Sequence, residues 1–191
     1  MKAKFNNLPY VNCPPKASAH IEGIRAYGYN PPKAIADIID NSITAKAKNI
    51  WIIYNFNKIN PLESKIAVLD DGQGMKESEL DDAMRLHSKN PTDKRSKEDL
   101  GRFGLGLKSA SLSQSSTLTV RSKKDNDDNI RCWDLDYIRQ FEEYRIIKGS
   151  IDTKSDFMLK LLDTFSSGTL VLWENLVFLK DHTEHSEQVN N

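Results

Sequence analysis

The segment Leu69-Asp70-Asp71-Gly72-Gln73-Gly74-Met75 ends one predicted strand and opens a turn. Residues 65–69 (KIAVL) are apolar and β-rich, and Asp70 follows them at the strand end. Gly72 and Gly74 are spaced for tight backbone geometry and for close approach of a ligand. An aspartate in this place can accept a hydrogen bond from an exocyclic amine. An ordinary strand-to-helix turn is the simpler alternative, because Asp-Gly is common in turns.

A predicted amphipathic helix precedes this segment. Two prolines at residues 31–32 suit a helix start, and small or apolar residues then recur at spacings of three and four up to about residue 48. Asp37 and Asn41 are four residues apart and share one face of this helix. A carboxylate can orient or deprotonate a water molecule, and an amide oxygen is a hard ligand suited to Mg²⁺. Taken alone, the pair is more simply explained as two polar residues on a solvated face.

A glycine-rich stretch follows at residues 100–114 (LGRFGLGLKSASLSQ). Its glycines run directly into a predicted helix at residues 107–112, so backbone amides lie at a helix start that favours an anion such as phosphate. The Walker P-loop pattern is not met, because Leu107 separates Gly106 from Lys108. A flexible hinge is the alternative explanation of the stretch.

The composition is that of a globular protein with balanced charge. The chain has 191 residues, 38% of them hydrophobic and 28% charged, which predicts a single domain with one core. Lys plus Arg (27) cancel Asp plus Glu (27), so no general positive field exists to hold nucleic acid or anionic lipid. Cys13 and Cys132 lie far apart and support neither a disulfide framework nor a zinc site. No signal-type or membrane-spanning apolar run occurs, so a cytoplasmic protein without a membrane partner is expected.

The remaining pattern predicts an α+β fold. Residues 49–56 (NIWIIYNF) and residues 65–69 are both expected to be buried strands, and the last strand is expected at residues 169–173. The economical arrangement is one mixed or antiparallel sheet with helices on one face. Further strands are expected at 117–121 and 130–135, and helices at 18–26, 77–86 and 156–165.

Taken together and in this order, the three motifs resemble the GHKL superfamily of ATPases, named for gyrase, heat-shock chaperones, histidine kinases and MutL. The resemblance is greatest to its bacterial MORC-like branch. Residues 36–42 (ADIIDNS) are similar to the asparagine-bearing helix, residues 69–75 to the adenine-binding turn, and residues 100–114 to the phosphate loop with its helix. Residues 168–173 (GTLVLW) resemble the closing strand, whose threonine assists adenine recognition. The resemblance covers most of residues 21–176 and implies a Bergerat-type two-layer sandwich with a mixed, mostly antiparallel sheet.

The resemblance also implies a nucleotide site with ATP and Mg²⁺ as cofactors. Asp37 would be the catalytic residue that activates the attacking water, at a position where many relatives carry a glutamate. Its side chain is shorter than that glutamate, which puts its reach to the water in question. Asn41 would bind Mg²⁺, Asp70 would meet adenine, and Met75 would pack on the base. The other residues implied to bind the nucleotide are Gly72, Gly74, Arg102, Phe103, Gly104, Leu105, Gly106, Leu107, Lys108 and Thr169.

The implied function is Mg²⁺-dependent ATP binding with slow hydrolysis, used as a conformational or dimerisation switch. Residues 1–180 would form the ATP-binding domain, with 1–30 as a dimerisation or lid segment, 88–103 as a closing lid and 181–191 as a flexible tail. Relatives usually append a transducer domain, so the chain is expected to be the nucleotide-binding module of a larger MORC-like protein, acting with such a domain or a partner protein. ATP sensing without catalysis and kinase-type phosphoryl transfer are the alternatives, and the neutral charge leaves DNA binding undecided.

Overall fold

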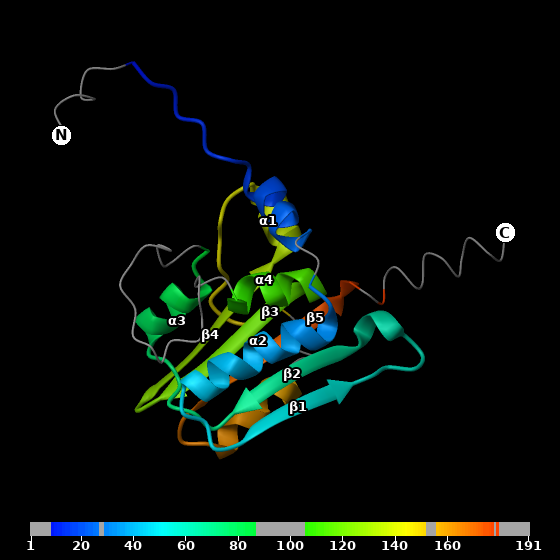
Figure 1. Ribbon diagram of the computed structural model, residues 1–191, viewed down its shortest axis with the longest axis vertical. Coiled ribbons are helices and arrows are strands. Elements are labelled where there is room, and N and C mark those ends of the chain that lie inside the picture. The colour runs from blue at the N-terminus through cyan, green and yellow to red at the C-terminus, as the bar shows by residue number, and fades with distance from the viewer. Residues whose placement is uncertain (1–8, 27–28, 87–105, 152–155, 178, 180–191) are drawn as a thin grey trace.

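The computed structural model describes residues 9–26, 29–86, 106–151, 156–177 and 179, and Figure 1 shows their arrangement. The segments 88–103 and 181–191, expected to be a lid and a tail, lie outside the described residues. None of the described helices is long and apolar enough to cross a membrane. Along the chain the elements are α1 (Ala17–Arg25), α2 (Pro31–Thr44), β1 (Ile50–Asn55), η2 (Pro61–Glu63), β2 (Lys65–Asp70), α3 (Glu77–Met84), α4 (Gly106–Gln114), β3 (Ser115–Lys124), β4 (Asp127–Asp134), α5 (Leu135–Phe141), α6 (Asp156–Leu159), η4 (Lys160–Thr164) and β5 (Gly168–Leu176).

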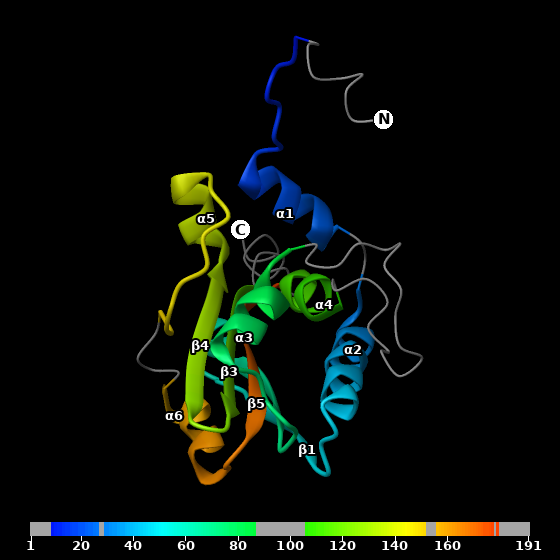
Figure 2. The ribbon, with the colours of Figure 1, turned by 90° about the vertical axis from the view of Figure 1, so that its left-hand side faces the viewer.

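The strands form one sheet in the order β1-β2-β5-β3-β4, and every neighbouring pair is antiparallel. The last strand of the chain therefore lies in the middle of the sheet. Its pairing places Thr169 opposite both Asp70 on β2 and Ser122 on β3. Helices α2 and α4 lie on one side of this sheet (Figure 2). The predicted α+β class with a two-layer arrangement is confirmed.

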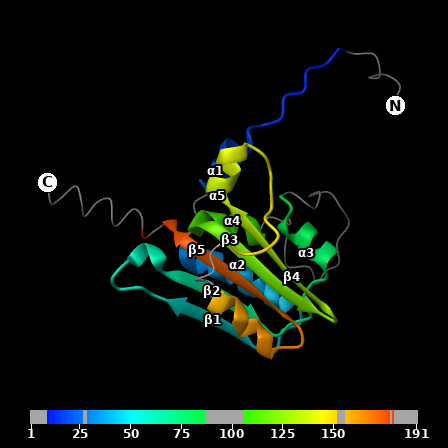
Figure 3. The same ribbon diagram turned by 180° about the vertical axis from the view of Figure 1, so that it is seen from behind.

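The side chains of β2 show how the sheet separates two cores. Ile66 and Val68 point toward the larger core, which they share with residues of α1, α2 and α4. Ala67 and Leu69 point to the opposite face and pack against apolar side chains of α6 and η4. The main helical layer lies on one face, as expected, and α6 with η4 covers part of the other face (Figure 3). These two short helices replace the single helix that the sequence predicted at residues 156–165.

Helix α2 carries the residues expected to perform chemistry. The Asn30 side chain caps its start by accepting a hydrogen bond from the Lys33 amide at 3.0 Å, and two prolines occupy the first helical positions. The helix ends at Thr44, short of the expected residue 48, because Lys46 adopts a left-handed φ of 61°. The buried face of α2 consists of Ala34, Ile38 and Ser42.

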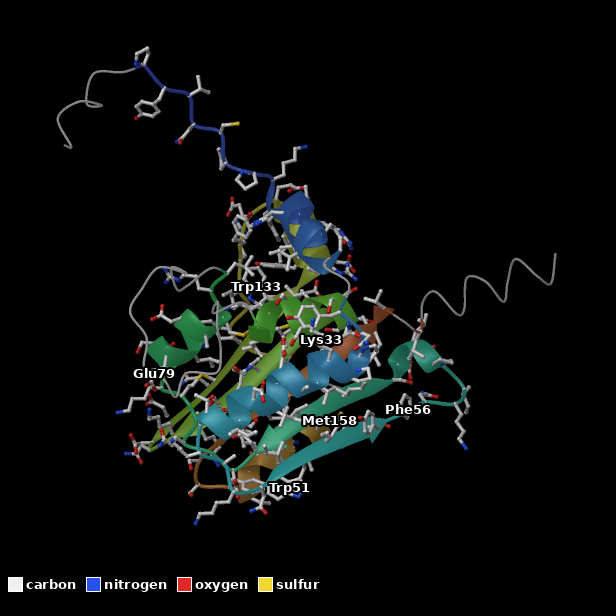
Figure 4. The ribbon with its side chains drawn as sticks, in the orientation of Figure 1. Lys33, Trp51, Phe56, Glu79, Trp133 and Met158 are labelled. Carbon is white, nitrogen blue, oxygen red and sulfur yellow. The ribbon has the colours of Figure 1, made fainter. Side chains whose placement is uncertain are left out.

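Strand β1 is the exposed edge of the sheet, so the expectation that it is buried was wrong. Within the described sheet it pairs only with β2, and Trp51, Ile52 and Tyr54 remain 38% to 51% exposed. Strand β2 has neighbours on both sides and is buried along its whole length. Two apolar strands look alike in sequence, and their order in the sheet decides which one is exposed. Figure 4 labels Trp51 and Phe56 along this outer edge.

Helices α1 and α5 pack together at one end of the sheet. The Ser18 hydroxyl on α1 donates a 2.7 Å hydrogen bond to the Glu142 carboxylate just after α5. The sequence did not predict α5: the expected strand at 130–135 ends early at Asp134, whose carboxylate caps the helix by accepting from the Tyr137 amide at 2.8 Å. Helix α1, which falls in the segment expected to serve in dimerisation or as a lid, therefore packs against its own domain.

Candidate functional site

A cavity of about 650 Å³ opens between α2, the turn after β2, the end of α3 and the start of α4. Its volume falls within the range of small-molecule sites, about 300 to 1,000 Å³. Of the residues predicted for the site, Arg102, Phe103, Gly104 and Leu105 lie outside the described residues, and Asp37 and Gly72 are described but do not line the cavity. The cavity lining includes these residues predicted to bind nucleotide: Asn41, Asp70, Gly74, Met75, Gly106, Leu107, Lys108 and Thr169.

The Asp70 carboxylate is buried at the cavity and held by three donors. Its Oδ2 accepts a hydrogen bond from the Ser42 hydroxyl at 2.8 Å, and its Oδ1 accepts from the backbone amides of Gly72 at 2.9 Å and Thr169 at 3.2 Å. Burial raises the pKa of Asp70, and these three hydrogen bonds oppose the rise. A carboxylate has about four lone-pair directions, so this one is oriented and can still accept from a ligand donor.

The turn after β2 needs both of its glycines for packing. A Cβ on Gly72 would lie 2.9 Å from the Ala45 carbonyl oxygen, and a Cβ on Gly74 would lie 1.8 Å from the Lys123 carbonyl oxygen. Gly74 also has a φ of 64°, in the left-handed region that favours glycine. Gly74 lines the cavity, whereas Gly72 is buried beneath the turn, outside the lining.

Ser122 on β3 forms hydrogen bonds with both the turn after β2 and the start of β5. Its Oγ accepts a hydrogen bond from the Met75 amide at 2.8 Å and lies 2.9 Å from the Thr169 hydroxyl. Gly168 precedes Thr169 with a φ of 148°, and a Cβ there would lie 2.1 Å from the Asp70 carbonyl oxygen. These hydrogen bonds and the pairing of β2 with β5 therefore keep three predicted site residues close together: Met75, Thr169 and Asp70.

Asp37 lies on α2 beside the start of α4. Its Oδ2 accepts a hydrogen bond from the Tyr29 hydroxyl at 2.8 Å and lies 4.0 Å from the place that a Cβ on Gly106 would take. Burial raises the pKa of Tyr29, and its contact with the Asp37 carboxylate raises this pKa further, so the phenol keeps its proton and stays the donor. Within the described part of the chain, the Asp37 carboxylate has no second hydrogen-bond partner. Its Oδ1 accepts no hydrogen bond from any of these residues.

Asn41 is the one predicted metal ligand. Its surroundings are compatible with a Mg²⁺ ion that enters the cavity together with the phosphates of a substrate. Asn41 lies one helical turn beyond Asp37, exposed at the cavity. The described residues contain no group of three or more His, Cys, Asp or Glu side chains that could hold a metal ion. Mg²⁺ is commonly bound through one or two protein oxygens together with waters and substrate phosphates. A single amide oxygen at the cavity is compatible with Mg²⁺ bound in this way.

Lys108 is buried, and its charge is directed to the end of α3. Its Nζ donates hydrogen bonds to the carbonyl oxygens of Ala83 and Arg85, each at 2.8 Å. These carbonyls lie at the carboxyl end of α3, where the helix dipole favours a cation. The family resemblance implied that Lys108 binds the nucleotide; the described contacts of its Nζ are with the protein.

Three polar residues contribute to the site without having been predicted for it. Ser42 lies on the buried face of α2, and a serine among apolar neighbours in the sequence indicates a buried hydrogen bond. Tyr29 and Ser122 have no such signal, because their partners, Asp37 and Met75, come near them only after folding.

Comparison with known proteins gives results that agree with this geometry. A family model described as histidine kinase-, DNA gyrase B- and HSP90-like ATPase matches residues 29–169. The chain is also similar to the DNA mismatch repair protein MutL of Dictyoglomus turgidum, with 33% identity over 105 residues. The matched part covers 52% of this chain and 17% of that protein. The chain thus matches only a small part of the length of this relative.

Proposed function

The chain belongs to the family of histidine kinase-, DNA gyrase B- and HSP90-like ATPases, and on that premise we propose that its cavity binds ATP with Mg²⁺ and hydrolyses it slowly. Membership of this family implies ATP binding; the metal dependence, the hydrolysis and the residue roles below belong to the proposal. The observation that carries it is one cavity of about 650 Å³ that combines the oriented Asp70 carboxylate, the Asn41 amide and the start of α4.

Asp70 would select adenine at one end of the cavity. Its carboxylate is held by Ser42, Gly72 and Thr169, so the remaining lone pair has a fixed direction toward the ligand. Adenine presents an amino group at the position where guanine presents a carbonyl oxygen. The carboxylate can accept from the first and would repel the second, so ATP should bind better than GTP. Met75 would contribute an adaptable apolar side chain to the face of the base.

The start of α4 would hold the phosphates at the other end. Gly106 and Leu107 line the cavity, and the first amides of a helix have no partners within the helix. They favour an anion, and the helix dipole adds to this preference. Asn41 would hold Mg²⁺, which supplies positive charge to the phosphate oxygens when it is bound.

Asp37 would orient the attacking water and accept its proton. It lies beside Gly106, close to where the phosphates would be held, and its Oδ1 is available to water. Because the side chain is short, correct placement of this carboxylate decides the rate. We therefore expect slow turnover, suited to a switch that changes conformation between the ATP and ADP states.

The switch would act through dimerisation and through other parts of a larger MORC-like protein. Tyr10 and Val11 are 87% and 89% exposed, in an extended segment that leaves the body of the domain (Figure 1). Such a segment suits a nucleotide-dependent contact with a second copy of the chain. The matched relative is much longer than this chain, which supports a role as a nucleotide-binding module that works with a transducer domain or a partner protein. The balanced net charge gives no support for DNA as a partner.

ATP sensing without hydrolysis is the second candidate function. The observation that favours it is the short side chain of Asp37, which stands where many relatives carry the longer glutamate. In that case the cavity would bind ATP and Mg²⁺ as proposed, and no phosphate would be released.

Calorimetric titration with a non-hydrolysable ATP analogue tests the proposal, first with Mg²⁺ and then with EDTA. We expect binding that requires Mg²⁺ and that is sharply weakened by Asn41→Ala. Thr44→Ala, on the same helix and outside the cavity lining, should bind like the wild type. Phosphate release measured over hours then separates the two candidates, because hydrolysis that falls strongly in Asp37→Asn, to a small residual rate, but not in Asp40→Asn supports the ATPase. Absence of binding in both buffers would refute the proposal.

A further inference from the structure

We infer that Tyr29 is a positioning residue for ATP hydrolysis, holding the Asp37 carboxylate in the orientation that receives the attacking water. The inference rests on the proposed function of Asp37. It starts from the 2.8 Å hydrogen bond that the Tyr29 hydroxyl donates to Asp37 Oδ2. A single aspartate on the partly exposed face of a helix would otherwise sample several rotamers.

Tyr29 is itself fixed from several directions. Its carbonyl oxygen accepts a 2.8 Å hydrogen bond from Nε2 of Gln114, a side chain that is 3% exposed at the end of α4. Its ring packs against the larger core, and the Lys33 ammonium lies 4.9 Å from the ring centroid. Lys33 is labelled on α2 in Figure 4. A phenol held in this way can determine where the carboxylate lies.

The phenol also connects the carboxylate to the helix that would hold the phosphates. Ser109, in the first turn of α4, forms a side-chain hydrogen bond with Tyr29. Tyr29 is thus hydrogen-bonded both to Ser109 on α4 and to Asp37 on α2. Asp37 is on α2 and Gly106 starts α4, so this chain of hydrogen bonds sets the carboxylate relative to the proposed phosphate site.

The chemical consequence concerns the orientation of the carboxylate. The Tyr29 hydroxyl occupies one lone pair of Oδ2, and Oδ1 accepts no hydrogen bond from the described residues, so we assign to Oδ1 the orientation of the water and the acceptance of its proton. Without the phenol the carboxylate would rotate, and fewer ATP complexes would hold water in line for attack. Removal of the hydroxyl should therefore lower kcat and not the affinity for ATP, because the proposed adenine contacts at Asp70 are unchanged.

Tyr29→Phe tests the inference, because it removes the hydroxyl and keeps the ring. We expect kcat to fall roughly tenfold, as for loss of one hydrogen bond to a charged group. Both KM and the affinity for a non-hydrolysable ATP analogue should stay within about twofold of wild type. Tyr54→Phe is the matched control, since Tyr54 lies on the exposed edge strand, outside the cavity lining. Its turnover should equal that of the wild type.

A double variant separates positioning from a general structural role. In the Asp37→Asn background, Tyr29→Phe should leave the residual turnover unchanged, because the group that it positions is absent. Equal turnover of wild type and Tyr29→Phe would overturn the inference and leave the ATPase proposal intact. A loss in affinity for the ATP analogue as large as the loss in kcat would also overturn the inference. A wild-type chain that binds no ATP, or binds it without releasing phosphate, would refute the ATPase and this inference together.

Discussion

The Ser42 hydroxyl on α2 donates a 2.8 Å hydrogen bond to the Asp70 carboxylate at the end of β2. Both residues are buried, with exposures of 2% and 5%. The contact joins the helix that carries Asp37 and Asn41 to the strand end that would recognise the base. It thereby fixes the two ends of the proposed nucleotide site relative to each other.

Ser42→Ala should weaken both the fold and the site. The substitution leaves one oxygen of a buried carboxylate without its donor, which should lower the free energy of unfolding by about 1 to 3 kcal/mol. Affinity for the ATP analogue should fall as well, because Asp70 loses part of its orientation. Urea unfolding and calorimetric titration measure the two effects, with Thr44→Ala as the control. Unchanged affinity in Ser42→Ala would show that this hydrogen bond does not orient the site.

Comparison of Asp70→Asn with the wild type should reveal how the Asp70 carboxyl group makes the free energy of unfolding depend on pH. Burial raises the pKa of Asp70 above its ordinary value of 3.8, so the folded protein binds this proton more tightly than the unfolded chain. The stabilisation contributed by protonation of Asp70 is complete below its ordinary pKa of 3.8 and is lost as the pH rises through the raised pKa. Asparagine removes the titration, so the unfolding free energy of the variant minus that of the wild type should increase with pH. Urea unfolding between about pH 4 and pH 7 measures this difference, and a flat difference would contradict the raised pKa.

Sequence patterns correctly predicted the elements whose structure depends on residues that are close together in the chain. The proline start and the spacing of apolar residues located α2, and the strand followed by two glycines located β2 with its turn. The three motifs and the segment at residues 168–173 also predicted eight of the 17 described residues that line the cavity. Each of these features depends on residues within about two turns of a helix or one strand.

Features that depend on distant pairing could not be predicted. The exposure of β1 follows from its place at the edge of the sheet, and apolar residues alone did not reveal that place. The contact of Tyr29 with Asp37 depends on how the chain enters α2, and that of Ser122 with Met75 depends on where β3 lies. The two glycines were predicted to serve tight backbone geometry and ligand approach, but the sequence could not show which distant backbone atoms pack against them.

Gly74→Ala should destabilise the protein strongly. A Cβ there would lie 1.8 Å from the Lys123 carbonyl oxygen, and the left-handed φ of 64° adds strain. Displacing packed backbone should cost about 3 kcal/mol or more in unfolding free energy. Gly23→Ala in α1 is the control, because no atom lies within 4 Å of its Cβ position and alanine is favoured over glycine in a helix. It should not lower the unfolding free energy, and an unchanged stability of Gly74→Ala would contradict the steric contact.

Lys108→Met should show whether the buried ammonium serves the fold or the phosphates. Methionine keeps the apolar stem but leaves the carbonyl oxygens of Ala83 and Arg85 without this donor. We expect the unfolding free energy without nucleotide to fall by about 2 to 4 kcal/mol. Lys58→Met, at an exposed position, should change it by less than about 0.5 kcal/mol. A Lys108→Met protein with wild-type stability and lost ATP binding would instead favour the nucleotide contact that the family resemblance implied. In that case ATP would have to draw the ammonium away from the end of α3.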